Sequence, residues 1–204
     1  MVKIKALCLG PLQTNCYVVH KESSTSCVVV DPACESDAIM AYLESHNLTL
    51  EAIFLTHGHF DHVSALEPLR ERTGCALWMH KGDYHQRKDP MIDYLYPLHD
   101  KDLGEIHFCG DGDQIFAGGL TFTVLSTPGH SLGSVCYLAE KTLLSGDTLF
   151  AGGCGRTDLP GGNWATIQIS LADLSELADE IQVFPGHGES TTLAREKRYN
   201  PYMR

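Results

Sequence analysis

The chain has 204 residues, of which 43% are hydrophobic and 20% are charged, a balance that is typical of a globular protein and argues against a disordered one. Its formal net charge of −11 argues against a nucleic-acid partner, because such binding depends on lysine and arginine side chains that neutralise phosphates. The length allows a substantial core, and we expect one domain over residues 1–204.

No targeting or membrane segment is recognisable in the sequence. The N-terminus lacks a basic stretch followed by a long apolar run, and nowhere do about eighteen apolar residues follow one another. We therefore expect a cytoplasmic protein without a membrane partner. The eight cysteines include no Cys-x-x-Cys pair, and in a reducing cytoplasm we expect free thiols rather than four disulfides. Cys8, Cys27 and Cys136 lie in strand-like runs and are predicted to act as small hydrophobic residues.

The first part of the chain alternates strand-like runs with helical periodicity. The second and third strands are predicted to form a hairpin around the polar turn 21–24. The apolar run 28–30 predicts a strand that is covered on both faces. Ile39, Tyr42 and Leu43 form the apolar stripe of a predicted helix. The elements predicted here are strands over residues 3–9, 16–20, 26–31, 52–55 and 76–80, and helices over residues 35–46 and 63–72.

The second part of the chain begins with a poorly patterned stretch and is then rich in strands. Residues 82–102 are predicted to form an irregular connection whose histidines, His85 and His99, either contact substrate or lie incidentally on the surface, as do His80 and His107. The pair Gly118-Gly119 predicts a hairpin turn. The elements predicted here are strands over residues 105–108, 114–116, 120–126, 134–138, 142–144 and 181–184, and helices over residues 164–177 and 191–197.

Four potential metal ligands directly follow the apolar run 52–55. They are His57, His59, Asp61 and His62, and a buried strand that ends in such a loop delivers its side chains to one edge of a sheet. A single histidine here would be interpreted as a surface residue or a helix cap, but four ligands packed after a strand favour a metal site. Imidazole and carboxylate suit zinc, iron or manganese, and the spacing allows the ligands to divide between two neighbouring ions.

Three further candidate ligands follow strand-like runs in the same way. They are His130, Asp147 and His187, and each stands beside a glycine, which lets the backbone turn tightly and bring the side chain to a common site. The complete set of candidate ligands is His57, His59, Asp61, His62, His130, Asp147 and His187.

The two halves of the chain repeat one outline. The order of apolar run, helix, strand and histidine loop that starts at Val28 recurs from Leu143 to Gly188. Two such halves would stack two mixed sheets face to face with helices outside. We therefore predict an α+β fold, a four-layer αββα sandwich.

The order His-x-His-x-Asp-His, then His, Asp and His, resembles the metallo-β-lactamase superfamily over essentially the whole chain. Asp147 points to its glyoxalase II-like branch, since the β-lactamases themselves usually have cysteine there, which argues against antibiotic hydrolysis. The resemblance implies the metallo-β-lactamase fold and two divalent metal ions, for which zinc is favoured and iron or manganese stay open. It implies that His57, His59 and His130 hold one ion, that Asp61, His62 and His187 hold the other, and that Asp147 bridges them.

The same resemblance implies an enzyme. The expected activity is that of a dinuclear metal-dependent hydrolase, a glyoxalase II-like thioesterase that cleaves S-lactoylglutathione or a related acyl thioester by attack of a metal-bridging hydroxide. Asp61 and Asp147 are its expected catalytic residues. Asp31 is expected to steady the histidine loop, although it could instead form a turn with Pro32. The C-terminal helical domain of longer glyoxalase II enzymes is not expected, and the ending 194–202 resembles the short bacterial enzymes.

Basic side chains are the candidate substrate contacts. Arg156 looks like the counterpart of a substrate-binding lysine of glyoxalase II and could bind a carboxylate with two hydrogen bonds, or it could pair with Asp158 and brace its loop. Arg195, Lys197 and Arg198 could reach a substrate carboxylate or remain solvated near a helix end. The partner is then a small-molecule thioester.

One alternative activity comes from the loop 153–158. Its sequence Gly-Cys-Gly-Arg-Thr-Asp also resembles persulfide dioxygenases, which bind one iron and oxidise glutathione persulfide. Cys154 would then be reactive, or else a buried structural thiol. These enzymes tend to have Pro-Ala-His-Asp-Tyr where this chain has Pro185-Gly186-His187-Gly188-Glu189, which favours the hydrolase. A metal-binding module without turnover and an RNA-processing nuclease are less favoured, because no ligand is missing and the chain lacks a basic arm.

Overall fold

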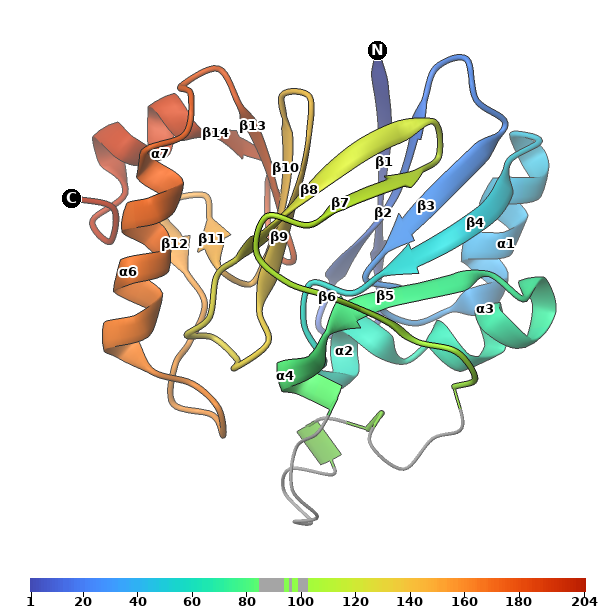
Figure 1. Cartoon of the computed structure of the whole chain (residues 1–204), viewed down its shortest axis with the longest axis horizontal. Coiled ribbons are helices and arrows are strands. Elements are labelled where there is room, and N and C mark those ends of the chain that lie inside the picture. The colour runs from blue at the N-terminus through green and yellow to red at the C-terminus, as the bar shows by residue number, and fades with distance from the viewer. Residues whose placement is uncertain (85–93, 96, 99–102) are drawn as a thin grey trace.

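Two six-stranded sheets stacked face to face form the centre of the molecule (Figure 1). The computed structural model describes residues 1–84, 94–95, 97–98 and 103–204. Helices α1 (Ser36–Ser45) and α3 (Leu66–Thr73) cover the outer face of the first sheet, and α6 (Trp164–Ser175) and α7 (Leu193–Tyr199) cover that of the second. The predicted αββα sandwich is confirmed. None of the described helices is long and apolar enough to cross a bilayer.

The first sheet has the strand order β1-β2-β3-β4-β5-β6. Its first three strands are antiparallel, which confirms the predicted hairpin, and β3 to β6 are parallel. Parallel strands deliver the loops that follow them to the same edge of a sheet. The strands are β1 (Val2–Leu9), β2 (Thr14–Lys21), β3 (Ser26–Val30), β4 (Thr49–Phe54), β5 (Ala76–His80) and β6 (His107–Cys109).

The second sheet has the strand order β14-β13-β10-β9-β8-β7. Only the β10–β13 pair is parallel, and the hairpin predicted at Gly118-Gly119 joins β7 to β8. The strands are β7 (Gln114–Ala117), β8 (Leu120–Ser126), β9 (Val135–Ala139), β10 (Thr142–Gly146), β13 (Gln182–Pro185) and β14 (Thr191–Thr192). A separate short hairpin consists of β11 (Leu149–Phe150) and β12 (Gly153–Cys154).

Aromatic packing between the sheets fixes their relative position near the edge where the histidine loops emerge. The ring of Phe54 lies 5.0 Å from that of Phe122 and 4.9 Å from that of Tyr137, and all three side chains are fully buried. The hydroxyl of Tyr137 donates to Leu55 O at 2.9 Å, and that of Tyr17 donates to Pro185 O at 2.7 Å. Each bond crosses from one sheet to the other and holds the strand end from which a ligand loop departs.

The structure departs from the predicted elements at several ends. The helix expected over 63–72 is two helices, α2 (Phe60–Val63) and α3, because Ala65 leaves the helical conformation and its N–H donates to Pro32 O at 2.9 Å. The strand expected over 105–108 begins at His107. In the segment expected to be a helix over 191–197, the first two residues form the strand β14, and the helix α7 follows them. The two-residue strands β11 and β12 were not predicted, because they are too short to show periodicity.

Most of the connection predicted over 82–102 lies outside the described residues, including His85 and His99. Its start is helical, as α4 (Lys81–Tyr84). His80 accepts a hydrogen bond from Gly82 N at 3.0 Å, and His107 stacks on Trp78 with ring centroids 4.7 Å apart. These two histidines therefore have structural contacts of their own.

All eight cysteines are free thiols. Cys27 and Cys136 are fully buried, and burial raises their pKa to about 12 and about 11, so both are unreactive hydrophobic residues as predicted. The prediction was wrong for Cys8, which is exposed. Its strand, β1, is at the edge of the first sheet and has one face toward solvent, which the apolar character of the run does not reveal.

Candidate metal centre

Strand ends from both sheets deliver the seven candidate ligands to one edge of the sandwich. His57 and His59 follow β4, and Asp61 and His62 lie on α2. The other three, His130, Asp147 and His187, follow β8, β10 and β13. Residues that are up to 130 positions apart in the sequence therefore meet at this edge, beside α2.

His57, His59 and His130 form a first ligand set. One ring nitrogen of each lies within 4.8 Å of the others, and all three side chains are buried. Nε2 of His130 is 2.9 Å from Nδ1 of His59. Burial and the neighbouring histidines lower the pKa of His57 well below its usual value, and burial likewise lowers that of His59 to about 3. Both rings are neutral at pH 7, which is the form that binds a metal ion.

Asp61, His62 and His187 form a second set with the same spacing. Asp61 Oδ2 is 3.3 Å from His187 Nε2 and 3.4 Å from His62 Nε2. Burial acts to raise the pKa of Asp61, but its contacts with His187 and His62 hold that pKa well below the usual value. Burial acts to lower the pKa of His62, but the charges of Asp147, Asp31 and Asp61 outweigh it and raise that pKa to about 9. The carboxylates around His62 thus favour positive charge at the centre of this set.

Asp147 lies between the two sets. Its Oδ1 is 3.4 Å from His62 Nε2, and its Oδ2 is 3.5 Å from His187 Nε2 and 3.6 Å from His130 Nε2. Gly186 packs against this carboxylate so closely that a side chain there would collide with Asp147 Oδ1. One carboxylate therefore reaches ligands of both sets.

The donor set fits divalent metal ions. Among the buried side-chain atoms of the described residues, His57 Nε2, His62 Nε2 and Asp147 Oδ1 are three that form no hydrogen bond, although the last two face each other at 3.4 Å. Buried polar atoms without partners are rare and costly, and these three point into one cluster. Imidazole nitrogens and carboxylate oxygens are the donors that zinc, iron and manganese accept. The residues present therefore suit a metal centre.

Asp31 holds the histidine loop from behind. Its Oδ1 accepts the N–H of Thr56 at 2.7 Å, and its Oδ2 accepts the Thr56 hydroxyl at 2.6 Å and His62 Nδ1 at 2.9 Å. His57 Nδ1 lies 3.1 Å from the same hydroxyl. This chain of hydrogen bonds occupies Nδ1 of both histidines and leaves their Nε2 atoms facing the cluster. Asp31 lies within 4.8 Å of ligand atoms of His57 and His62, but its oxygens are already used.

Arg156 contacts the site through its backbone. Its carbonyl oxygen lies 2.8 Å from His130 Nδ1, which orients that ring. Its exposed guanidinium donates to both carboxylate oxygens of Asp158 at 2.7 Å. Of the two roles expected for this side chain, the structure has the one that braces the loop.

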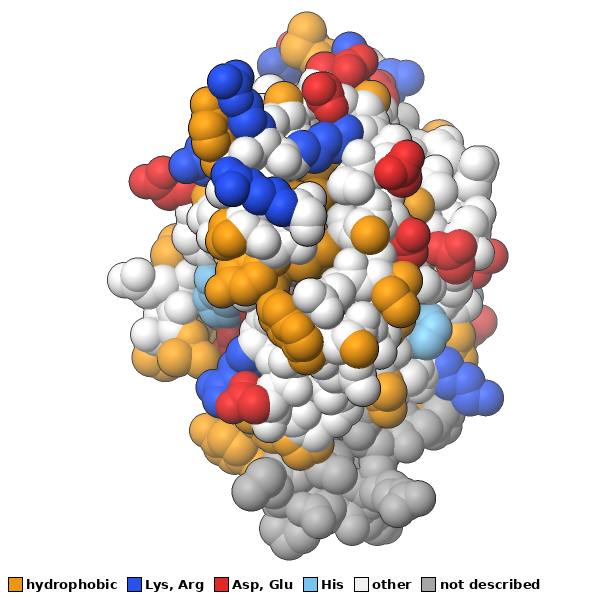
Figure 2. Space-filling model, turned by 90° about the vertical axis from the view of Figure 1, so that its left-hand side faces the viewer, with side chains coloured by type: hydrophobic (Ala, Val, Ile, Leu, Met, Phe, Trp, Pro, Cys, Tyr) orange, Lys and Arg blue, Asp and Glu red, His pale blue; other side chains and the backbone are white. Residues whose placement is uncertain are grey.

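The other basic candidates have partners near the C-terminus. Arg195 pairs with Glu196 at 3.1 Å, Lys197 pairs with Asp179 at 2.7 Å, and Arg198 lies over the ring of Tyr199. Figure 2 views the molecule from the side of α6 and α7, and shows lysine and arginine side chains in the upper part of that face, above a group of hydrophobic side chains. Each of the three candidates thus has a partner beside it other than the metal centre.

Two buried polar residues at the start of β2 support the second set and were not predicted. Thr14 donates its hydroxyl to Asp61 Oδ2 at 3.0 Å. Asn15 donates its side-chain amide to Pro185 O at 3.0 Å and to Gly188 O at 2.9 Å, on either side of His187. Gln-Thr-Asn between two strands is typical of an exposed turn, so no local signal in the sequence identifies their role.

Asp83 supports the first set and was also not predicted. This buried carboxylate accepts Gly58 N at 2.9 Å, Ser131 Oγ at 2.7 Å and Gly133 N at 2.7 Å. Gly58 lies between two ligands and Ser131 directly follows a third. Burial raises the pKa of Asp83 even though these hydrogen bonds favour its charged form. Asp83 therefore ties the loop after β4 to the loop after β8.

Replacing Asp83 with Asn is expected to lower the free energy of unfolding by about 1–3 kcal/mol. In the variant, the amide nitrogen of Asn would face a buried backbone N–H whose acceptor in the wild type is a carboxylate oxygen. We also expect metal affinity to fall about tenfold or more, because the first set loses its brace. Chemical denaturation and competition with a chelator measure these effects. Asp113→Asn is the matched control, since Asp113 accepts Gly110 N at 2.8 Å in an exposed turn. Unchanged stability and affinity in the Asp83 variant would contradict this role.

Comparisons with known proteins agree with this geometry. A sequence profile described as the metallo-beta-lactamase superfamily matches residues 9–187. The hydroxyacylglutathione hydrolase GloC of Haemophilus influenzae is 31% identical over 209 residues, which cover 99% of this chain and 98% of GloC. The crystal structure of the BLEG-1 B3 metallo-beta-lactamase has a TM-score of 0.87 at 34% identity and covers 98% of this chain and 99% of that chain. TTHA1623 in a di-iron-bound form has a TM-score of 0.84 at 35% identity, with coverage of 97% and 99%.

Proposed function

Because this chain belongs to the metallo-β-lactamase superfamily, we propose that it is a dinuclear metal-dependent hydrolase, specifically a glyoxalase II-like thioesterase. Its substrate is S-lactoylglutathione or a related acyl thioester. The observation that carries the proposal is the carboxylate of Asp147, which reaches ligands of both sets. The similarity to GloC supports the thioesterase.

In this proposal, His57, His59 and His130 hold one ion, Asp61, His62 and His187 hold the other, and Asp147 contacts both. Divalent ions bound there would supply Lewis acidity, which polarises a carbonyl and lowers the pKa of water toward neutrality. Zinc is the metal that we favour. The di-iron form of TTHA1623 leaves iron as an alternative, and manganese is a third candidate.

The protein's own groups prepare the site for hydrolysis. The hydroxyl of Thr14 fixes Asp61 Oδ2, which holds this carboxylate in one position for binding a metal ion and orienting a water molecule. Asp31 and Thr56 hold the histidines of the loop in one orientation, so ligand geometry needs no rearrangement during the reaction. Cys154 is only partly buried, yet burial raises the pKa of its thiol, so it is a poor nucleophile. Water activation is the chemistry that this arrangement favours.

Arg156 is our proposed contact for the thiol half of the substrate. It lies at the rim of the first set, because its carbonyl contacts His130, and its guanidinium is exposed. A substrate carboxylate would replace Asp158 as its bidentate partner.

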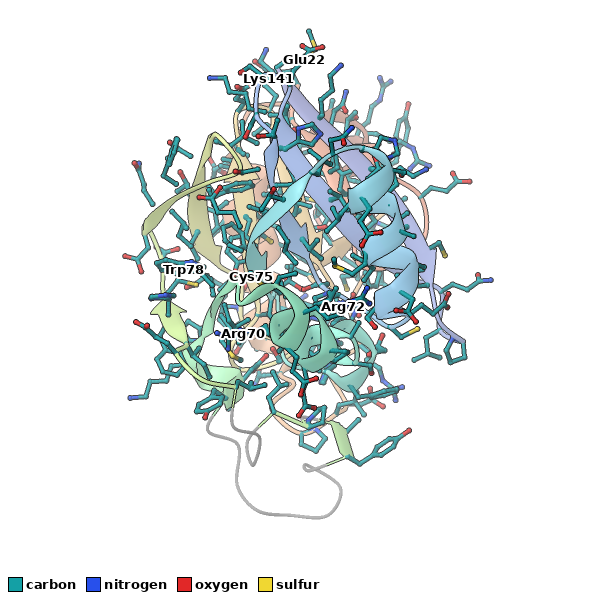
Figure 3. The ribbon with its side chains drawn as sticks, turned by 90° about the vertical axis from the view of Figure 1, so that its right-hand side faces the viewer. Glu22, Arg70, Arg72, Cys75, Trp78 and Lys141 are labelled. Atoms are coloured by element: carbon teal, nitrogen blue, oxygen red, sulfur yellow. The ribbon has the colours of Figure 1, made fainter. Side chains whose placement is uncertain are left out.

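Replacing Arg156 with Ala is expected to raise KM for S-lactoylglutathione about tenfold with kcat nearly unchanged, because a binding contact is lost while the ligands keep their places. Arg156→Lys should recover part of the affinity. Arg72→Ala is the matched control, since Arg72 on α3 (Figure 3) forms a similar exposed pair with Asp37 at 2.6 Å. Steady-state kinetics measure KM and kcat separately. An unchanged KM would show that Arg156 only braces its loop.

The experiment that tests the proposed function is hydrolysis of S-lactoylglutathione by metal-loaded protein, compared with a chromogenic β-lactam. We expect kcat/KM for the thioester to lie in the range that is usual for enzymes, and to exceed kcat/KM for the β-lactam by at least about a hundredfold. Efficient hydrolysis of the β-lactam without thioester turnover would contradict the proposal.

A mononuclear iron persulfide dioxygenase is the second candidate. The observation that favours it is the loop 153–158, which resembles the loop of those enzymes and here lies against the first set through Arg156. If the protein is such a dioxygenase, it takes up oxygen with glutathione persulfide and has no thioesterase activity. The complete second set of ligands favours the hydrolase.

A further inference from the structure

A small apolar cavity lies beside the second ligand set. Its volume is about 120 Å³, and it is formed by the end of β1, the turn into β2, the residues after β3 and the helix α2. The residues that matter for its chemistry are Leu9, Leu12, Thr14, Ala33, Phe60 and Asp61. An apolar cavity of about 150 Å³ can hold a molecule the size of benzene, so this one has room for a chain of about four carbons.

Asp61 belongs both to the second set and to the wall of this cavity. Both hydroxyls of the wall are already used, because Thr14 donates to Asp61 Oδ2 at 3.0 Å and Ser64 donates to Phe60 O. Apart from these hydroxyls, the carboxylate of Asp61 and the thiol of Cys34, the side chains of the wall are apolar. Leu12 is 52% exposed, although it is a large hydrophobic side chain. The cavity therefore offers an apolar ligand a surface directly next to the metal centre.

The cavity and Arg156 adjoin different ligand sets. Arg156 contacts His130 of the first set, whereas the cavity shares Asp61 with the second set. A thioester whose carbonyl lies at Asp147 would direct its thiol half toward Arg156 and its acyl half toward the cavity. We infer that this cavity is the acyl-binding site, and that the substrate class is thioesters of short aliphatic acids. The inference rests on the proposed thioesterase function.

The length of the acyl chain tests the inference. We expect kcat/KM of the metal-loaded protein to rise about fourfold or more for each methylene from S-acetylglutathione to S-butanoylglutathione, because each added methylene is buried. Beyond about five carbons the values should level off or fall, because the cavity is full. Steady-state hydrolysis of the series from acetyl to octanoyl measures this dependence.

Two variants assign the dependence to the cavity. Ala33→Leu fills it and should abolish the rise, so that this variant hydrolyses the longer thioesters no faster than S-acetylglutathione. Leu12→Ala removes part of the exposed rim without a buried substitution, and should reduce the rise per methylene to about twofold, because less apolar surface is covered. Circular dichroism establishes that both variants are folded.

The outcomes separate the inference from the function on which it rests. Turnover of all thioesters with the same kcat/KM, or a rise that both folded variants retain, overturns the acyl site and leaves the thioesterase standing. Hydrolysis of none of them overturns both.

Discussion

Replacing Asp147 with Ala is expected to reduce kcat/KM for the thioester at least about a thousandfold, or about 4 kcal/mol of transition-state stabilisation. Its oxygens lie 3.4 to 3.6 Å from nitrogens of both ligand sets, so its removal affects both sets at once. We expect bound metal to fall from two ions to one or fewer per chain. Initial rates with excess metal and element analysis of the desalted protein measure the two effects.

Asp179→Ala is the matched control for this variant. Asp179 is an exposed carboxylate whose partner is Lys197, and its removal should leave activity and metal content within about twofold of wild type. Asp147→Asn keeps the shape and removes the charge, and we expect it to resemble the alanine variant. Two metal ions and normal turnover in Asp147→Ala would contradict the bridging role.

Replacing Asp31 with Ala is expected to have the second largest effect, a loss of about 3–5 kcal/mol in the free energy of unfolding. The carboxylate is buried and accepts hydrogen bonds from Thr56, through both its N–H and its hydroxyl, and from His62. Its removal leaves those donors without acceptors in a site that water does not reach. Because the histidine loop also loses its orientation, metal affinity should fall about 10- to 100-fold.

Chemical denaturation and chelator competition measure these effects, and Asp37→Ala is the matched control. Asp37 is 96% exposed and pairs only with Arg72 among the described residues, so its loss should leave stability and metal affinity unchanged within error. An Asp31 variant with normal affinity and stability would show that Asp31 forms only a strand-end turn with Pro32.

The sequence was most informative where one local pattern determines one contact. The apolar run before His57 predicts a buried strand, and β4 delivers the loop as expected. The glycines beside His130, Asp147 and His187 predicted that these three candidate ligands, far apart in the chain, reach a common site, and the structure brings them together. Hydrophobic periodicity and turn-forming residues are local properties, so they can be recognised in the sequence before the fold is known.

The residues that were missed depend on contacts that are distant in the sequence. Asp83 stands in Lys-Gly-Asp-Tyr, which is typical of a surface turn, and its three partners come from two other loops. Thr14 and Asn15 likewise meet their partners across 47 to 173 residues. The exposure of Cys8 follows from the edge position of β1, and strand order is not a local property of the sequence.

The measurement that tests the central claim most directly is the metal content of the purified protein, saturated with zinc or iron and then desalted. If the seven residues hold two ions joined by Asp147, element analysis gives two per chain, and both are lost to a chelator. One iron per chain, with no second ion at any concentration, would contradict the dinuclear centre and favour the dioxygenase.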